Sequence, residues 1–541
     1  MKRSVTIIVS MLVGVSALNA QSAFDAYNIS QSNELRGTAR YMSMAGAFGA
    51  LGGDLSVLNH NPGGIGVYRS SDIGATFGVT VRNTEAGEGA DMYKVKETDF
   101  NFTNIGYVGA LKLKSEAMPN INWGFSYNRL ADFRRHYTGD ISNIGTSMTN
   151  YIAGQTNLGG YTPDELGAVR NEYNPYQNPN LPWASILAYN SYLINPQSEN
   201  GNYVGLLDDL STGRSAFTVD ESGQADEYSI SFGGNVYNTL YWGASLGILD
   251  FDHTLNTYYG ETIQNAYVPY ETPSTVGMEN GTADWNIQNS LHTFGTGVNF
   301  KLGVIVKPIN ELRIGLAFHT PTRYSITQDY IASTGYNIKP DNHEAIRGDA
   351  YTDEGYIGRD QFTVRSPWKF IGSIAGVIGG RAIISLDVEH TAYPSMGILH
   401  DGVEDAYTCE TIEKYFKSTE TVRVGAEYKV TPKFSLRAGY SIQTSTMSEA
   451  VENDKLSIAT AGTTLSYNFD KNIQHVTCGI GYRHNNFYAD LAYVYRNRES
   501  HYYAFSPDYA FSPDEYKYIM SPNAPVEDKN HSVALSLGFR F

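Results

Sequence analysis

Arginine side chains recur on the polar faces of segments whose polarity alternates along the chain. Counted by alternation, six of them point away from the apolar face, namely Arg82, Arg313, Arg381, Arg423, Arg437 and Arg483. A guanidinium group in a desolvated interior binds a carboxylate more strongly than it does in water. Arg323 and Arg365 stand toward the outer ends of their segments, and we expect them to bind the carboxylate of a ligand. In the competing interpretation, such arginines pair with acidic side chains of neighbouring segments, namely Asp387, Glu389, Glu427 or Asp490.

The residue pattern does not indicate a catalytic site. Asp387 and Glu389 share one face of their segment and His390 lies on the other, so they do not form one acid–base site. The glycine run at Gly46, Gly49 and Gly52 lacks the preceding strand and the spacing of a dinucleotide loop. We therefore predict no catalytic residues and no cofactor. An enzyme that assembles its residues from distant strands is the alternative.

The two cysteines, Cys409 and Cys478, fall in an expected external loop and on an expected lipid-facing position. A disulfide between them is not expected, and two cysteines cannot form a thiolate metal site. We predict no metal site.

The elements that position these residues are strands. The last eleven residues alternate strictly, with Val533, Leu535, Leu537, Phe539 and Phe541 on one face and small or polar residues on the other. An apolar face that no following element covers indicates lipid as its solvent. The alternation predicts an all-β transmembrane barrel with a polar lumen.

Fourteen such segments can be counted. They lie near 72–82, 103–114, 120–130, 226–238, 240–254, 285–306, 311–326, 360–377, 380–391, 420–430, 433–443, 473–484, 486–498 and 531–541. Short turns alternate with long connections, near 255–284, 327–359 and 499–530 among others, and the largest connection covers about 131–225. An even strand count with this asymmetry predicts a 14-stranded antiparallel barrel in the bacterial outer membrane, short turns facing the periplasm. A soluble β-sandwich is the alternative, but the second face is too polar for one.

The N-terminus and the composition agree with this location. Residues 1–20 carry Lys2 and Arg3, an apolar core and a terminal Ala20, which predicts a secretory signal peptide. Mean hydropathy is −0.32, and no uninterrupted apolar run beyond the leader reaches the length of a membrane helix. Loss of Lys2 and Arg3 changes the net charge from −17 to −19, because 1–20 hold no acidic residue. This acidity argues against nucleic acid as a partner.

Residues 21–70 precede the first strand and do not alternate. They are rich in small residues, and Asp54 is placed to cap a short helix that ends before the turn at Asn61 and Pro62. A segment of this size at the periplasmic side of a wide barrel can plug the lumen. We therefore divide the chain into a signal peptide (1–20), an N-terminal hatch (21–70) and a barrel (71–541).

One stretch of the longest loop is apolar. Residues 181–194 include Trp183, Ile186, Leu187 and Tyr189 within a polar, Asn- and Gly-rich connection. Exposed apolar patches usually mark binding surfaces, so we expect these four residues to capture a hydrophobic ligand. Packing of the loop over the barrel mouth is an equally good and compatible interpretation.

The N-terminal segment resembles the FadL/TodX family of outer-membrane transporters for long-chain fatty acids and other hydrophobic compounds. The resemblance rests on Gly37-Thr-Ala-Arg-Tyr-Met-Ser-Met-Ala-Gly46, on Ala47-Phe-Gly-Ala-Leu-Gly-Gly-Asp54 and on Asn61-Pro-Gly-Gly-Ile65. The family has Ala where this chain has Gly63, which predicts a more mobile turn here. The resemblance implies passive transport by loop capture, lumen binding, movement of a hatch that includes Asp54, Asn61, Pro62 and Gly63, and lateral exit.

The expected partners are a hydrophobic small molecule, outer-membrane lipid and the barrel-assembly machinery, which would meet the C-terminal strand at Phe541. We expect a monomer. A break in strand three near 126–130, where Arg129 falls on the lipid face, is the expected lateral opening. The alternatives are a family member that serves as a secretion-system shuttle or surface adhesin, and an open porin.

Overall fold

A computed structural model gives the structure of the chain. It describes residues 22–541 except 32–33, 88–91, 168, 170–172, 199–200, 273–274, 461 and 512–515. The expected signal peptide lies outside the described residues. None of the described helices is long and apolar enough to cross a membrane.

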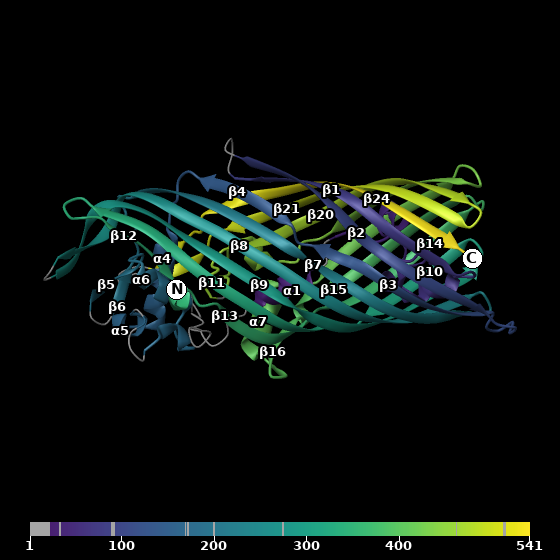
Figure 1. Cartoon of the computed structure of the whole chain (residues 1–541), viewed down its shortest axis with the longest axis horizontal. Helices are drawn as coiled ribbons and strands as arrows, with labels where there is room; N and C mark the ends of the chain where they lie inside the picture. The colour runs from purple at the N-terminus through teal and green to yellow at the C-terminus, as the bar shows by residue number, and fades with distance from the viewer. Residues whose placement is uncertain are drawn as a thin grey trace, which may run out of the picture.

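Antiparallel strands close into a barrel whose axis lies horizontally in Figure 1. Fourteen wall positions are occupied, two of them by a pair of strands that continue one another. In order around the wall they are β1 Asp72–Ala86, β2 Tyr93–Lys112, β3 Asn120–Asp132, β7 Thr212–Val236, β8 Leu240–Thr272, β9 Thr275–Ile309, β10 Leu312–His319 with β11 Arg323–Pro340, β14 Trp368–Ile378 with β13 Gly358–Arg365, β15 Ala382–Ala392, β18 Thr419–Lys429, β19 Phe434–Gln443, β20 Tyr467–His484, β21 Phe487–Tyr503 and β24 Asn523–Arg540. β24 returns to pair with β1 from Asp72↔Arg540 to Ala86↔Val526, so the sheet has no free edge.

The predicted barrel is confirmed, and its two faces separate as the alternation requires. On β24, Val533 and Phe539 are each 45% exposed on the outside, whereas Ala534 and Ser536 are almost fully buried on the inside. Every backbone N–H and C=O at membrane depth needs a partner within the protein, and a closed barrel provides one.

Several strands run much further than expected. The connection predicted near 255–284 is a continuous hairpin, because β8 and β9 stay paired up to Thr272↔Thr275. The prediction of a long loop there is wrong. Polar, Tyr- and Thr-rich residues keep the alternation and the β-propensity beyond the point where the apolar face ends. The barrel therefore extends well outside the lipid.

The remaining elements gather at the outer end of the barrel or cover its wall there. They are β4 Arg135–Ile141, α4 Met148–Gly159, α5 Pro163–Leu166, η2 Pro175–Gln177, α6 Trp183–Asn190, β5 Asn195–Ser198, β6 Gly201–Val204, β12 Ile346–Tyr351, η3 Thr352–Gly355, η4 Tyr393–Ser395, β16 Gly397–His400, β17 Val403–Glu404, α7 Ala406–Tyr415, α8 Glu449–Glu452, β22 Asp508–Phe511 and β23 Tyr516–Ile519. In Figure 1, α4, α5 and α6 close one end, opposite the C-terminus.

Residues 22–71 form short helices that are enclosed by the wall. These helices are α1 Ala23–Ser30, α2 Ala39–Ser43, α3 Val57–His60 and η1 Pro62–Val67. The small residues of this segment suit the enclosed space, since Ala45, Ala47 and Ala50 are fully buried. The lumen of the barrel is therefore filled rather than open.

Candidate functional site

The turn at Asn61 fastens the N-terminal segment to the barrel wall. The Asn61 side chain is fully buried, accepts a hydrogen bond from Gly63 N at 3.0 Å, and donates to the carbonyl of Gly49 at 2.6 Å. It also donates to the carbonyl of Val304 on β9 at 3.3 Å. One amide thus holds the turn in shape and ties it to a strand.

Gly63 lies against bare backbone of the wall. A Cβ added at Gly63 would stand 2.8 Å from the backbone of Gly303 and Val304, and one added at Gly303 would overlap the Asn61 side chain. Glycine at this position therefore permits a close contact between the turn and β9, and the expected mobility of the turn stays a prediction. Two glycines on the lumen side of the wall also permit close contacts. Gly243 on β8 lies against the backbone of Pro62, and Gly315 on β10 lies against the backbone of Gly49.

Asp54 joins two short helices instead of capping one. Its Oδ1 accepts hydrogen bonds from the Thr38 hydroxyl at 2.7 Å and from Ser56 N at 3.0 Å. Thr38 is the N-cap of α2, and Ser56 occupies the N-cap position of α3. The expected capping role is corrected, since α3 begins two residues too late for Asp54 to be its cap.

Two buried polar contacts that the sequence pattern did not predict hold the segment to β15 and β18. His60 Nε2 lies 2.9 Å from Asp387 Oδ2, which also accepts from Gly49 N at 2.8 Å. Arg40 on α2 pairs with Glu427 at 2.9 Å. A matching signal was present in the sequence: the acidic partners occupy polar-face positions of β15 and β18, where the lumen must satisfy each charge.

A cavity of about 130 Å³ lies between α1 and the extracellular part of the lumen. Its wall combines aromatic rings with two guanidinium groups, those of Arg135 and Arg498. Both arginines pair with Asp528 at 2.8 Å, and Arg135 also lies over the ring of Tyr137 at 4.7 Å. The cavity therefore offers an apolar surface beside two guanidinium groups and the carboxylates of Asp25, Glu221 and Asp470. Among the described residues no His, Cys, Asp or Glu group has the arrangement of a metal site.

Helix α1 forms the floor of this cavity and is held by aromatic contacts. The ring of Phe24 lies 5.4 Å from that of Tyr467, and Tyr27 stacks on Phe416 at 5.1 Å. Asp25 accepts a hydrogen bond from Gln328 at 3.1 Å, and burial raises the pKa of its carboxyl. Helix α1 is therefore held by ring contacts and by a hydrogen bond to β11, whereas the Asn61 turn is held by hydrogen bonds to backbone carbonyls.

Strand β3 separates from its neighbour β2 partway along the wall. The β2–β3 ladder ends at Asn104↔Asn128, and a bulge follows between Arg129 and Ala131 on the side paired with β7. Arg129 pairs with Asp226 at 3.1 Å. Strand three is therefore irregular where the sequence analysis expected a break.

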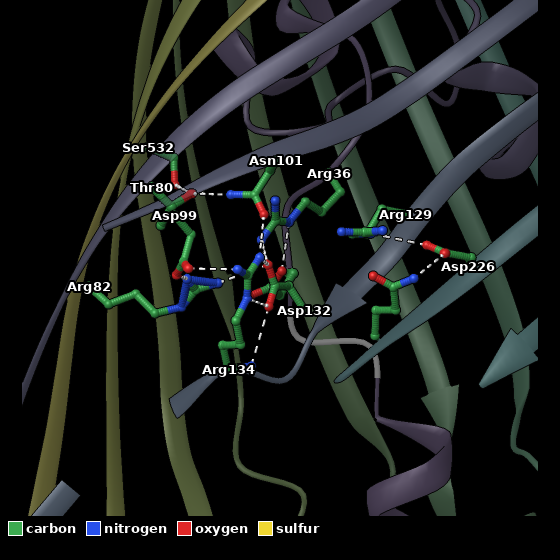
Figure 2. Close-up of polar contacts among 12 residues, drawn as sticks. Arg36, Thr80, Arg82, Asp99, Asn101, Arg129, Asp132, Arg134, Asp226 and Ser532 are labelled. Atoms are coloured by element: carbon green, nitrogen blue, oxygen red, sulfur yellow. Dashed lines mark hydrogen bonds and ion pairs between the residues drawn. The ribbon is translucent and has the colours of Figure 1, made fainter. Parts of the chain in front are cut away.

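Ionic side chains fill the space beyond that ladder (Figure 2). Asp132 lies 3.1 Å from Arg82 on β1, 2.7 Å from Arg134, and 3.7 Å from Arg36 of the N-terminal segment. Arg82 and Arg134 also pair with Asp99 on β2. Side chains, not backbone hydrogen bonds, thus join the wall here, and one of them belongs to the segment inside the lumen.

Arg323 and Arg365 do not reach the lumen. Residues 320–322 lie opposite only two residues of β9, 299–300, so the chain between β10 and β11 contains one extra residue at this point. The extra residue exchanges the inward and outward positions of the strand that follows, and Arg323 therefore faces outward. A second break at 366–367 does the same for Arg365. The expectation of a lumenal carboxylate pair is corrected. Among the arginines that parity assigns to the lumen, Arg423 pairs with Glu389 and Arg437 with Glu427 and Asp490. Arg313 instead donates to the carbonyl of Leu51 at 2.6 Å.

The four apolar residues chosen for capture lie on α6 and are mostly covered. Ile186 and Leu187 are fully buried in the apolar core of the extracellular part, and Trp183 and Tyr189 are half-buried. The Trp183 ring contacts Tyr330 of β11 at 4.9 Å. Direct capture by Ile186 and Leu187 is therefore corrected to packing of the loop over the barrel mouth.

One family model matches part of the chain. Residues 221–487 match the family model described as outer membrane protein transport protein (OMPP1/FadL/TodX). A FadL homologue from Pseudomonas aeruginosa shares 12% identity and a TM-score of 0.49, over 93% of this chain and 98% of that one. The Pseudomonas putida toluene transporter TodX gives 12% and 0.44, over 94% and 100%. No curated protein matches the sequence.

Substitution of Gly63 by Ala tests the close contact of the N-terminal segment. The added methyl would overlap β9 backbone and loosen the turn, at a cost of about 1–3 kcal/mol. We expect higher single-channel conductance in planar bilayers. Gly372→Ala is the matched control, because open space surrounds its Cβ position. Equal conductance of the Gly63→Ala variant and the unmodified protein would contradict a tight contact.

Substitution of Ile186 by Ser tests the packing role of α6. Loss of a fully buried side chain and burial of a hydroxyl should destabilise the extracellular part by about 2–4 kcal/mol. We expect faster proteolysis between 131 and 225 with an unchanged barrel. Leu158→Ser on α4 is the control, because Leu158 is 37% exposed. Cleavage rates that match for the two variants would argue that α6 is not part of the core.

Proposed function

We propose that this chain is an outer-membrane channel for hydrophobic compounds and that its ligands are long-chain fatty acids. The match of residues 221–487 to the OMPP1/FadL/TodX family model supports the channel. The observation that carries this proposal is the lumenal cavity, which brings Arg135 and Arg498 next to aromatic rings. A carboxylate can exchange with Asp528 as their partner, while an alkyl chain lies on the rings. An aromatic hydrocarbon would use only the apolar surface.

The proposed route requires α1 to move. The cavity, at about 130 Å³, is smaller than the roughly 300–1,000 Å³ of typical ligand sites. A long chain therefore fits only if Phe24 and Tyr27 leave their aromatic neighbours. We propose that 21–70 act as a hatch, with α1 yielding first and the Asn61 turn, with Asp54, Pro62 and Gly63, acting as the anchor.

The proposed exit is the interruption between β2 and β3. Backbone hydrogen bonds do not have to break there beyond Asn104↔Asn128, because side chains close the space. Arg36 of the hatch contributes to that closure through Asp132, at 3.7 Å. Displacement of the hatch would thus remove one cation from the ionic cluster and weaken the closure at the same time. Passage needs no energy source in this scheme.

Uptake of labelled oleate by cells without their own transporter tests the proposal. Cells that express the intact chain should take up oleate, and replacement of both Asn61 and Pro62 by Ala should reduce uptake at equal membrane levels. The physical reason is loss of the amide that ties the hatch to Gly49 and Val304. Uptake of labelled toluene is measured in parallel with the same cells.

Uptake of toluene but not oleate would contradict the fatty-acid assignment. If the cells take up neither oleate nor toluene, although the barrel is folded and its electrophoretic mobility changes on heating, the result would favour the shuttle or adhesin role. Unchanged oleate uptake in the double variant would refute the hatch as the gate.

A further inference from the structure

Three neighbouring wall positions are broken at one level. The strands stop at Pro321 between β10 and β11, at Pro367 between β13 and β14, and at Pro394 after β15. The strand register shows that the three breaks lie side by side. The pairs His319↔Lys369 and Arg323↔Arg365 stand on either side of the first two breaks, and the pair Arg365↔Gly397 stands beside the third. Proline has no N–H for a ladder, so its recurrence on adjacent strands interrupts the sheet.

Hydroxyl groups close this proline seam, which we define as residues 320–322, 366–367 and 393–396. Thr320 Oγ1 accepts from Phe300 N at 3.0 Å, Ser366 Oγ from Thr322 N at 2.8 Å, and Ser395 Oγ from Trp368 N at 3.3 Å. Each hydroxyl adjoins one of the prolines. The wall therefore stays closed at the seam, and the break alters the outer surface instead.

The outer surface at the seam carries a groove of about 710 Å³. Its floor is apolar and faces outward, with Val298 51% and Trp368 38% exposed. Its rim holds Arg323, Arg365 and, on the overhanging β17 and α7, Glu404 and Glu413. Figure 1 shows β16 and α7 together beside β13 at this part of the wall.

The two arginines differ in their partners. Arg365 pairs with Glu404 and donates to Ser395 O at 3.2 Å. Arg323 is exposed and makes no ion pair within the described part of the chain. Arg323 is therefore the cation of the groove that is available to bind an anionic ligand.

The groove lies where the apolar outer belt ends. On one side the wall presents Leu302 and Phe370, 45% and 48% exposed, and on the other it presents Asp252 and Arg359, 53% and 61% exposed. Trp368 stands at the transition, where aromatic girdles of such barrels meet the headgroups. An anion that reaches Arg323 by lateral diffusion is thus a lipid headgroup of the outer leaflet.

We propose that the seam groove binds a phosphorylated outer-leaflet glycolipid, with Arg323 as the phosphate ligand and an acyl chain on Leu246, Val298 and Phe300. A guanidinium group forms paired, charge-assisted hydrogen bonds with phosphate. The apolar floor continues directly into the lipid-facing wall, so the acyl chain does not leave the membrane. This site is separate from the lumenal cavity and does not depend on the transported ligand.

Native mass spectrometry of the full-length protein tests the proposal, with bisphosphorylated lipid A and its phosphate-free counterpart as probes. The unmodified protein should retain the bisphosphorylated form about tenfold more tightly, and Arg323→Gln should abolish that difference. Arg359→Gln is the matched control, an outward arginine of β13 beyond the groove. Equal retention by Arg323→Gln and the unmodified protein, or equal loss in Arg359→Gln, would overturn the proposal.

Thiol protection gives a second readout that does not need the arginine variant. Cys409 lines the groove, and Cys478 is exposed on β20, so Cys478→Ala leaves one reporter thiol. Burial raises the pKa of Cys409, so labelling with a maleimide is done at mildly alkaline pH. Bisphosphorylated lipid A should slow labelling several-fold more than the phosphate-free form. Equal rates with both lipids, or protection by oleate instead, would refute a glycolipid site.

Discussion

The satisfaction of backbone polar groups in lipid is the constraint on which this structure depends. A strand at membrane depth has no water to bind, so the sheet must close on itself, and β24 does so against β1. Closure creates a wide interior, and the interior must then satisfy every inward side chain. The N-terminal segment, the buried pairs of Asp387 and Glu427, and the wall glycines are the consequences.

The same constraint explains how the wall tolerates its two irregularities. Between β2 and β3, ionic side chains replace the ladder, and charges in a partly desolvated site attract one another strongly. At the proline seam, hydroxyl groups supplement the backbone hydrogen bonds that remain, and the outer surface becomes concave. The first irregularity includes a residue from inside the lumen, Arg36, and the second opens a groove on the outer surface. They are therefore suited to different tasks.

Most of the fold was predictable from sequence, because alternation is a local property. The fourteen strands, their faces and the lumenal pairing of Arg423 and Arg437 follow from a period of two. Parity fails after a bulge, which is why Arg323 and Arg365 were assigned to the wrong side. Pro321 and Pro367 within predicted strands were the available warning. The cover over Ile186 and the contact of His60 with Asp387 join segments that are far apart in the chain, and no local pattern encodes which segments meet.

The last strand also fixes the order in which the molecule can be completed. Arg540 donates to the carbonyl of Gly53 and pairs with Asp72, both at 2.9 Å, and the backbones of Phe541 and Ser71 exchange hydrogen bonds. Residues 540 and 541 thus join residues 53, 71 and 72 in a single latch. Contacts of such sequence separation form late and slowly. Because Gly53 belongs to the N-terminal segment, the latch is complete only when that segment lies in place, so closure of the barrel includes its occupant.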